Sequence, residues 1–207
     1  MECRLLARRP CMAVVRWLGK FVLWRCFHPG ATTGMKCTTL RYRICQLERC
    51  QTLNHAILEQ YRKILDQNPS GLERSHWFEG RYENLYIPAT VFTAIQPVLE
   101  QARIAAADFL GLGRLPEVGF WLNDMRPGQV TLRHRHDEDD ELLSAAYYVQ
   151  VPENSGDLVL EQAGTHTRIP PRAGNLVMFP PEVPHEVTRH RGQGMRLSVG
   201  MNFGFRD

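Results

Sequence analysis

From residue 118 onward the chain alternates short β-type runs with turn residues, and this pattern restricts the fold more than any other feature. The runs are rich in Val, Leu, Tyr and Phe, and segments rich in Pro, Gly, Asn and Asp, such as 126–128 and 152–156, separate them. Several short strands at this spacing are typical of a β-sandwich or barrel. The predicted strands are 118–123, 129–134, 143–151, 157–161, 166–169, 176–179, 185–188 and 195–205.

Two helical patterns precede these strands. Apolar residues recur at helical spacing over 53–66, and the segment QNPSG (67–71) ends that helix. Residues 89–112 are rich in Ala and Leu and finish in a glycine stop, so they predict a second helix. The aromatic-rich segment 75–88 is predicted to be a connection, and a first β-like run covers 38–44. The predicted fold class is therefore α+β and mainly β, with the two N-terminal helices packed on one sheet.

Charge is unevenly distributed along the chain. The first 50 residues carry ten Lys/Arg and two Glu, whereas the remainder carries fifteen Lys/Arg and twenty Asp/Glu. The residues after position 50 are mildly acidic and lack the positive charge of a nucleic-acid-binding surface, so no nucleic-acid partner is expected. The apolar run 12–24 is interrupted by Arg16 and Lys20 and falls short of the ~20 apolar residues of a membrane span. We expect residues 1–34 to be a peripheral or disordered basic extension, and 35–207 to be one domain with its core strands within 118–205.

All six cysteines lie within the first 50 residues. A disulfide framework could therefore not tie the predicted strands together, and no CxxC pair indicates a zinc knuckle. A body that does not need oxidising conditions favours a cytoplasmic location. The sequence leaves the oligomeric state open.

Three histidines form a pattern typical of a metal site. His134 and His136 stand two residues apart at the end of a predicted strand, and His185 opens another strand about fifty residues later. Because side chains alternate along a strand, the two histidines of the pair face the same side. Imidazoles suit Fe, Zn, Cu or Ni, and three protein ligands leave positions open for substrate, water or oxygen. We therefore predict a metal site formed by His134, His136 and His185.

The segments around these histidines carry a family resemblance. They are WLN (121–123), HRH (134–136), 142–160, 171–187 and MRLSVGMNF (195–203), in that order. With these segments the chain resembles the Fe(II)/2-oxoglutarate-dependent oxygenases. It is most similar to the prolyl-hydroxylase-like branch of bacterial and phage members, in which His-x-His replaces His-x-Asp/Glu. The resemblance covers about residues 118–205 and implies a double-stranded β-helix, that is, a jelly-roll or cupin-like fold.

The resemblance also implies an activity. Such an enzyme would use Fe(II), 2-oxoglutarate and O2 to hydroxylate a C–H bond of a small-molecule or peptide substrate, such as peptidyl proline, an amino acid or a small metabolite. Arg196, eleven residues after the distal histidine, would bind the far carboxylate of 2-oxoglutarate, because a buried dicarboxylate needs a fixed bidentate cation. Ser198 would lie beside it on the same strand face, and Tyr148 or its neighbour Tyr147 would contact the cosubstrate. No catalytic residue beyond the metal and cosubstrate ligands is expected.

The second metal ligand departs from the family pattern. His136 stands where the family has Asp or Glu. A carboxylate of the acidic run 137–141, such as Glu138 or Glu141, could complete the site instead, or the run could be a solvated loop that orients the imidazoles.

Two other interpretations of the same residues stay open. One is a cupin-type metalloprotein that would use His134, His136, Glu141 and His185 without 2-oxoglutarate. The other is a catalytically silent metal-binding domain. The Arg-x-Ser pattern that begins at Arg196 favours the oxygenase over the cupin, which would not need it, and bound iron without oxygen consumption would indicate the silent domain.

Overall fold

The computed structural model describes residues 40–67, 72–136 and 141–205. The predicted basic extension, residues 1–34, lies outside these ranges, as do residues 137–140 of the acidic run. The helices are α1 (Cys50–Gln67) and α2 (Gln96–Leu110), with a short 3-10 helix, η1 (Thr93–Ile95), directly before α2. The strands are β1 (Arg43–Gln46), β2 (Glu73–Phe78), β3 (Arg81–Tyr86), β4 (Glu117–Met125), β5 (Thr131–His134), β6 (Glu141–Gln150), β7 (Leu158–Gln162), β8 (Thr165–Ile169), β9 (Asn175–Phe179), β10 (His185–Val187) and β11 (Arg196–Gly204).

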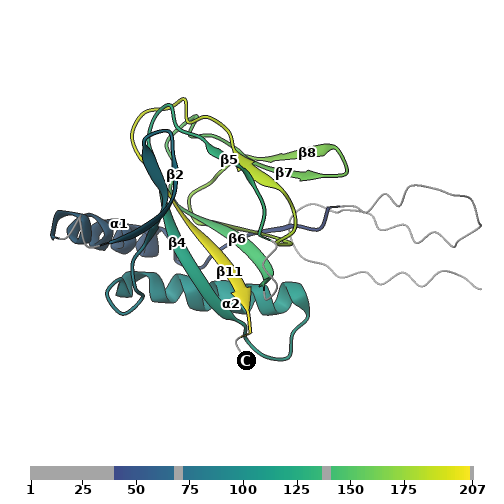
Figure 1. Cartoon of the computed structure of the whole chain (residues 1–207). Coiled ribbons are helices and arrows are strands. Elements are labelled where there is room, and N and C mark those ends of the chain that lie inside the picture. Colours follow the sequence, from purple (N-terminus) through teal and green to yellow (C-terminus); the bar gives the residue numbers. More distant parts are fainter. Residues whose placement is uncertain (1–39, 68–71, 137–140, 206–207) are drawn as a thin grey trace, which may run out of the picture. The chain divides into compact units, whose positions relative to one another are not determined.

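The strands form two antiparallel sheets (Figure 1). The larger sheet has the order β1-β9-β6-β11-β4-β3-β2, and the smaller has the order β5-β10-β7-β8. A cluster of buried residues joins the two sheets, with Tyr148 and Phe179 from the larger and Leu160 from the smaller. The mainly β architecture that the turn spacing predicted is thereby confirmed.

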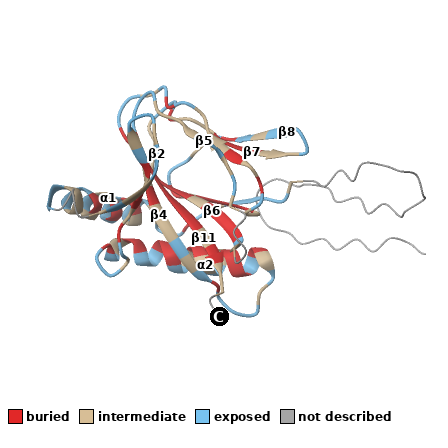
Figure 2. Ribbon diagram, viewed as in Figure 1, coloured by how far each residue is buried: buried red, intermediate tan, exposed pale blue. Residues whose placement is uncertain are grey.

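Both helices pack on the outer face of the larger sheet, as predicted. Val199 of β11 lies in one hydrophobic cluster with Ile57 of α1 and Val98 of α2. Figure 2 shows the buried side of α2 turned toward the strands of this sheet. The Tyr61 hydroxyl of α1 donates a 2.9 Å hydrogen bond to the Asp124 carboxylate of β4. The outer face is thus sealed by helices, which leaves the space between the sheets for a site.

The prediction that residues 75–88 form a connection was wrong. They lie in the hairpin of β2 and β3, which pairs Phe78 with Arg81 across a two-residue turn. The turn residues Glu79 and Gly80 have φ of 46° and 78°, and positive φ at both positions suits the twist of a tight hairpin. The sequence signal was weak, because Glu rather than Asn or Asp occupies the first turn position. The hairpin extends the larger sheet beyond β4 and lies over the site.

Two predicted boundaries were also wrong. The second helix begins at Gln96 rather than at residue 89, and Pro97 stands in its first turn, where a missing N–H costs nothing. Its end was predicted well, since Gly111 takes the left-handed conformation with φ of 70°. The first strand covers Arg43–Gln46 rather than 38–44, because its pairing partner is the short β9 strand.

The described residues contain neither a helix that could cross a membrane nor a disulfide. Neither helix in the described ranges has the length and apolar character that a membrane crossing requires. Cys45 and Cys50 are free thiols, and the other four cysteines precede residue 40, outside the described ranges.

Candidate metal centre

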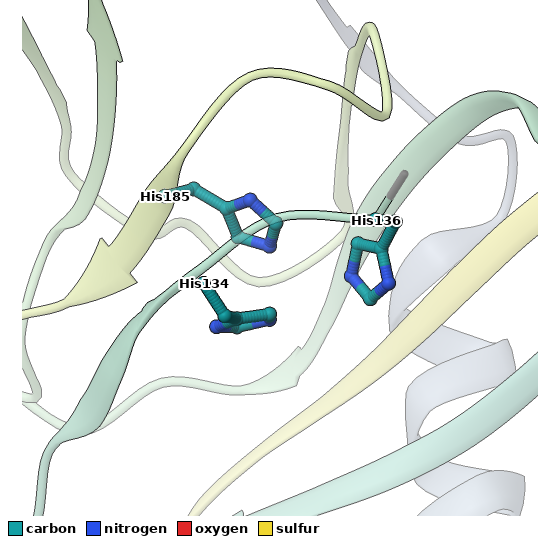
Figure 3. A group of neighbouring side chains, drawn as sticks. All are labelled: His134, His136 and His185. Atoms are coloured by element: carbon teal, nitrogen blue, oxygen red, sulfur yellow. The ribbon is translucent and has the colours of Figure 1, made fainter. Parts of the chain in front are cut away.

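The three predicted histidines lie together between the two sheets (Figure 3). His134 ends β5 and His185 begins β10, and the two residues are partners in the register of these strands. His136 follows two residues after the end of β5. Each ring offers a nitrogen, and these nitrogens lie within 4.8 Å of one another. Within residues 40–67, 72–136 and 141–205, this is the one group of three His, Cys, Asp or Glu side chains with such spacing.

Two of the three imidazoles are oriented by backbone carbonyls. Nδ1 of His134 lies 2.7 Å from the carbonyl oxygen of Leu132, and Nδ1 of His185 lies 3.0 Å from that of Val183. A carbonyl can only accept, so the proton of each ring is on Nδ1. Nε2 then keeps its lone pair for a metal, which is the usual arrangement of a metal-bound histidine.

The buried position of His185 keeps its ring neutral. Burial, together with the neighbouring His134, lowers the pKa of His185 to about 3. A metal ligand must be unprotonated, so protons do not compete for this ring at neutral pH.

His136 has a different environment from the other two rings. Its Nδ1 lies 4.0 Å from Glu141 Oε2 and 3.4 Å from the Asn202 side-chain nitrogen. The Trp121 indole also packs against this ring, with 5.6 Å between the ring centroids. Of the two acids considered as alternative ligands, Glu138 lies outside the described residues, and Glu141 faces Nδ1 of His136.

Arg196 opens β11 beside this cluster and is deeply buried. Only 2% of the residue is exposed, and burial lowers the pKa of its guanidinium. Its guanidinium carbon lies 5.3 Å from the centre of the Tyr148 ring, and one terminal nitrogen contacts the Met125 sulfur at 3.3 Å. Its Nε and the Tyr148 hydroxyl are buried and have no hydrogen-bond partner at close distance among the described residues, although the two side chains interact electrostatically with each other. A buried cation with an unused donor is unfavourable on its own and calls for an anion.

Strand pairing brings the other predicted cosubstrate residues to the same place. Ser198, two residues after Arg196 on β11, pairs with Tyr148 on β6. Both residues are buried and line the cavity between the sheets. Tyr147 turns to the opposite face, where its hydroxyl donates a 2.6 Å hydrogen bond to Asn54 of α1. The structure therefore brings the three histidines, Arg196 and Ser198 together around one cavity. Of the two tyrosines, Tyr148 lines this cavity and Tyr147 does not.

The cavity that holds these residues has a volume of about 350 Å³, within the range of small-molecule sites.

The β2–β3 hairpin forms one wall of this cavity, although the sequence predicted only a connection there. Arg81 and Glu83 form a 3.2 Å ion pair there, and Arg81 also donates to the Val130 carbonyl, which ties the hairpin to the segment before β5. At the outer edge, Trp77 is 64% exposed and contacts Tyr82 edge to face. Only the alternation of aromatic and polar residues over 75–88 could have indicated this wall.

Most of the strand-rich part of the chain matches a known family model. Residues 120–204 match the family model described as the 2OG-Fe(II) oxygenase superfamily. This range contains all six of the predicted site residues: His134, His136, Tyr148, His185, Arg196 and Ser198. The match confirms the resemblance that the sequence motifs indicated. A comparison with curated protein sequences finds no match.

Solved structures share the fold over most of the chain. A prolyl-4-hydroxylase from Pseudomonas putida is 23% identical, with a TM-score of 0.57, and covers 82% of this chain and 90% of its own. A prolyl hydroxylase from Trichoplax adhaerens, in complex with a hypoxia inducible factor peptide fragment, is 16% identical, with a TM-score of 0.59 and coverage of 79% and 83%. SnoK, a non-heme alpha ketoglutarate dependent carbocyclase from nogalamycin biosynthesis, is 14% identical, with a TM-score of 0.66 and coverage of 81% of both chains. At these identities the likeness shows the fold, and it confirms the predicted jelly roll.

Proposed function

We propose that this chain, whose residues 120–204 match the model of the 2OG-Fe(II) oxygenase superfamily, is an Fe(II)- and 2-oxoglutarate-dependent hydroxylase of that superfamily. One observation carries the proposal: a buried arginine whose Nε has no hydrogen-bond partner among the described residues lies in the same cavity as a cluster of three histidines. A metal site alone would not need this arginine. A dicarboxylate bound between the two features would use both.

The three histidines fit a transition metal. His134 and His185 would each bind through Nε2, because their Nδ1 protons are already engaged by backbone carbonyls. His136 would be the third protein ligand, in the position where the family has a carboxylate. Three protein ligands leave open positions for a chelating cosubstrate and O2.

The residues around Arg196 fit 2-oxoglutarate. The Arg196 guanidinium would bind the far carboxylate of the cosubstrate with two parallel hydrogen bonds. The Tyr148 hydroxyl, which has no hydrogen bond to a described residue, and the Ser198 hydroxyl beside it would donate to the same carboxylate. Such binding would satisfy the buried donors that the protein alone leaves unused.

When bound, Fe(II) and 2-oxoglutarate would supply the oxidising chemistry that activates O2 and hydroxylates a C–H bond. The residues of the chain would keep this reaction in an enclosed site. Apolar side chains from both sheets, among them Leu158 and Phe179, would exclude water from the cavity. The β2–β3 hairpin, with Trp77 at its exposed edge, would form the wall past which the substrate enters. Peptidyl proline, an amino acid and a small metabolite are all compatible substrates, since structures of this fold include both a prolyl hydroxylase and a carbocyclase.

An anaerobic titration tests the proposal. Fe(II) is added to the full chain, followed by 2-oxoglutarate, and the weak visible charge-transfer band of the chelate is followed. Arg196→Met should lose the band while still binding Fe(II). Arg126→Met is the matched control, because Arg126 is an exposed arginine whose partner, Asp124, lies outside the cavity. Iron binding without a band in the unaltered protein would indicate a metalloprotein that acts without 2-oxoglutarate, and no iron binding would indicate a domain without metal chemistry.

A further inference from the structure

We propose that Glu141 is a positioning residue that orients His136 and supplies negative charge near the metal site, where His136 replaces the family's usual carboxylate ligand. The inference rests on the proposed function, because it assumes that the three histidines bind a metal. It concerns the one histidine that departs from the family pattern.

His136 differs from its two partners in what holds its ring. His134 and His185 each lie against the backbone carbonyl two residues earlier, so local chain geometry orients them. Nδ1 of His136 instead faces side chains of two other strands, Glu141 of β6 and Asn202 of β11. Two of the side chains that contact this ring nitrogen can therefore be changed without altering any of the three histidines.

Hydrogen bonds fix the Glu141 carboxylate in place. The Asn202 side-chain nitrogen donates a close hydrogen bond to Glu141 Oε1. The Asn202 oxygen in turn accepts a 2.9 Å hydrogen bond from the Ser144 hydroxyl, which sets the orientation of the amide. The side chains of His136 and Glu141 are only 20% and 19% exposed, so solvent screens the contact weakly.

The contact geometry gives Glu141 its role. Oε2 lies 4.0 Å from Nδ1 of His136, whereas the Asn202 nitrogen, at 3.4 Å from the same atom, makes its shorter hydrogen bond to Glu141. The amide nitrogen can only donate, and its shorter hydrogen bond goes to Glu141, so the carboxylate is the group on this side that can accept the ring proton. It therefore favours the proton on Nδ1 and leaves Nε2 for the metal. Three unprotonated imidazoles bring no charge to Fe(II), so a carboxylate behind one of them adds attraction for the cation, although less than a directly bound carboxylate because the distance is longer.

The test uses the full chain and measures metal binding rather than turnover. The dissociation constant for Fe(II) and the Fe(III)/Fe(II) reduction potential are measured anaerobically for the unaltered protein, Glu141→Gln and Glu186→Gln. Glu141→Gln keeps the shape of the side chain and removes its charge, so we expect at least about tenfold weaker binding and a more positive potential. Glu186 adjoins His185 in sequence but points away from the cavity, so Glu186→Gln should change both quantities little.

The potential separates this role from simple loss of structure, since a merely structural contact would not shift it in one direction. Asn202→Ala is the second variant, because it keeps the carboxylate and removes its anchor, and its binding should weaken in the same direction. Unchanged affinity and potential in Glu141→Gln would overturn the inference while leaving the proposed function intact. An unaltered protein that binds no metal would overturn both.

Discussion

The indole of Trp121 fills the space that a side chain on Gly200 would need. A Cβ built on Gly200 would lie 2.3 Å from Cε2 of the indole. The two residues are register partners on β4 and β11, and the same indole packs against His136. The absence of a side chain at residue 200 thus lets Trp121 form the wall behind one of the three histidines.

Gly200→Ala should therefore destabilise the protein by about 1–3 kcal/mol, because the rigid indole must move to admit a methyl group. Chemical denaturation followed by circular dichroism measures the change. Gly119→Ala on β4 is the control, since a Cβ there meets nothing within 4 Å, and its effect should stay within about 0.5 kcal/mol. Equal stability of both variants would show that the indole is not fixed in this position.

The neighbouring tyrosines on β6 should separate stability from cosubstrate binding. The Tyr147 hydroxyl is bonded to buried Asn54, so Tyr147→Phe should cost about 1–3 kcal/mol of unfolding free energy and leave 2-oxoglutarate binding unchanged. The Tyr148 hydroxyl has no hydrogen bond to a described residue, so Tyr148→Phe should hardly alter stability but weaken 2-oxoglutarate binding. Each variant is the control for the other in thermal melts and in titrations of the Fe(II)-loaded protein. Equal loss of binding in both would contradict the assignment of opposite faces.

Arg196→Met should leave the ligand-free protein as stable as before, or more stable. The substitution replaces a buried cation with an unused donor, Nε, by an apolar side chain of similar length. The same change should abolish stabilisation by the cosubstrate. At 100 times its dissociation constant, 2-oxoglutarate should raise the unfolding free energy of the Fe(II)-loaded parent by about 2.7 kcal/mol. Denaturant curves with and without 2-oxoglutarate measure both effects, and strong destabilisation of the ligand-free variant would show that Arg196 is paired within the protein.

Most of the strands could be located from the sequence because turn residues interrupt regular β-type runs. Each of the eight strands predicted after residue 118 has a counterpart among β4 to β11, since Pro, Gly and Asn restrict the backbone locally. The three-histidine cluster followed from the period of a strand and from the family motifs. The β2–β3 hairpin could not be predicted as securely, because the turn uses Glu79 at a positive φ where Asn or Asp is expected.

The contacts around His136 could not be predicted from sequence patterns. Asn202 lies 66 residues from His136 and 61 from Glu141, so no local spacing indicates that the three meet. They come together because β11 pairs with β6 in a register that brings Gly204 opposite Glu141. Register across a sheet depends on packing over its whole length, which a local motif does not encode.

The buried His185 should make the metal-free protein sensitive to mild acid. Its pKa is about 3 in the fold, below its unfolded value near 6.5, so the unfolded chain binds the proton more readily. The stability contribution is therefore complete above pH ~6.5 and is lost as the pH falls toward ~3. From this group alone, the unfolding free energy should drop by about 2 kcal/mol between pH ~7 and pH ~5. Urea denaturation of chelator-treated protein across this range measures the slope.

His185→Gln should flatten this pH dependence, because the neutral amide does not titrate. His55→Gln is the matched control, since His55 is an exposed histidine of α1, and it should keep the slope of the parent protein. If His185→Gln and the parent give parallel curves, the His185 ring is protonated or solvated in the metal-free fold. Burial would then not keep it neutral for metal binding.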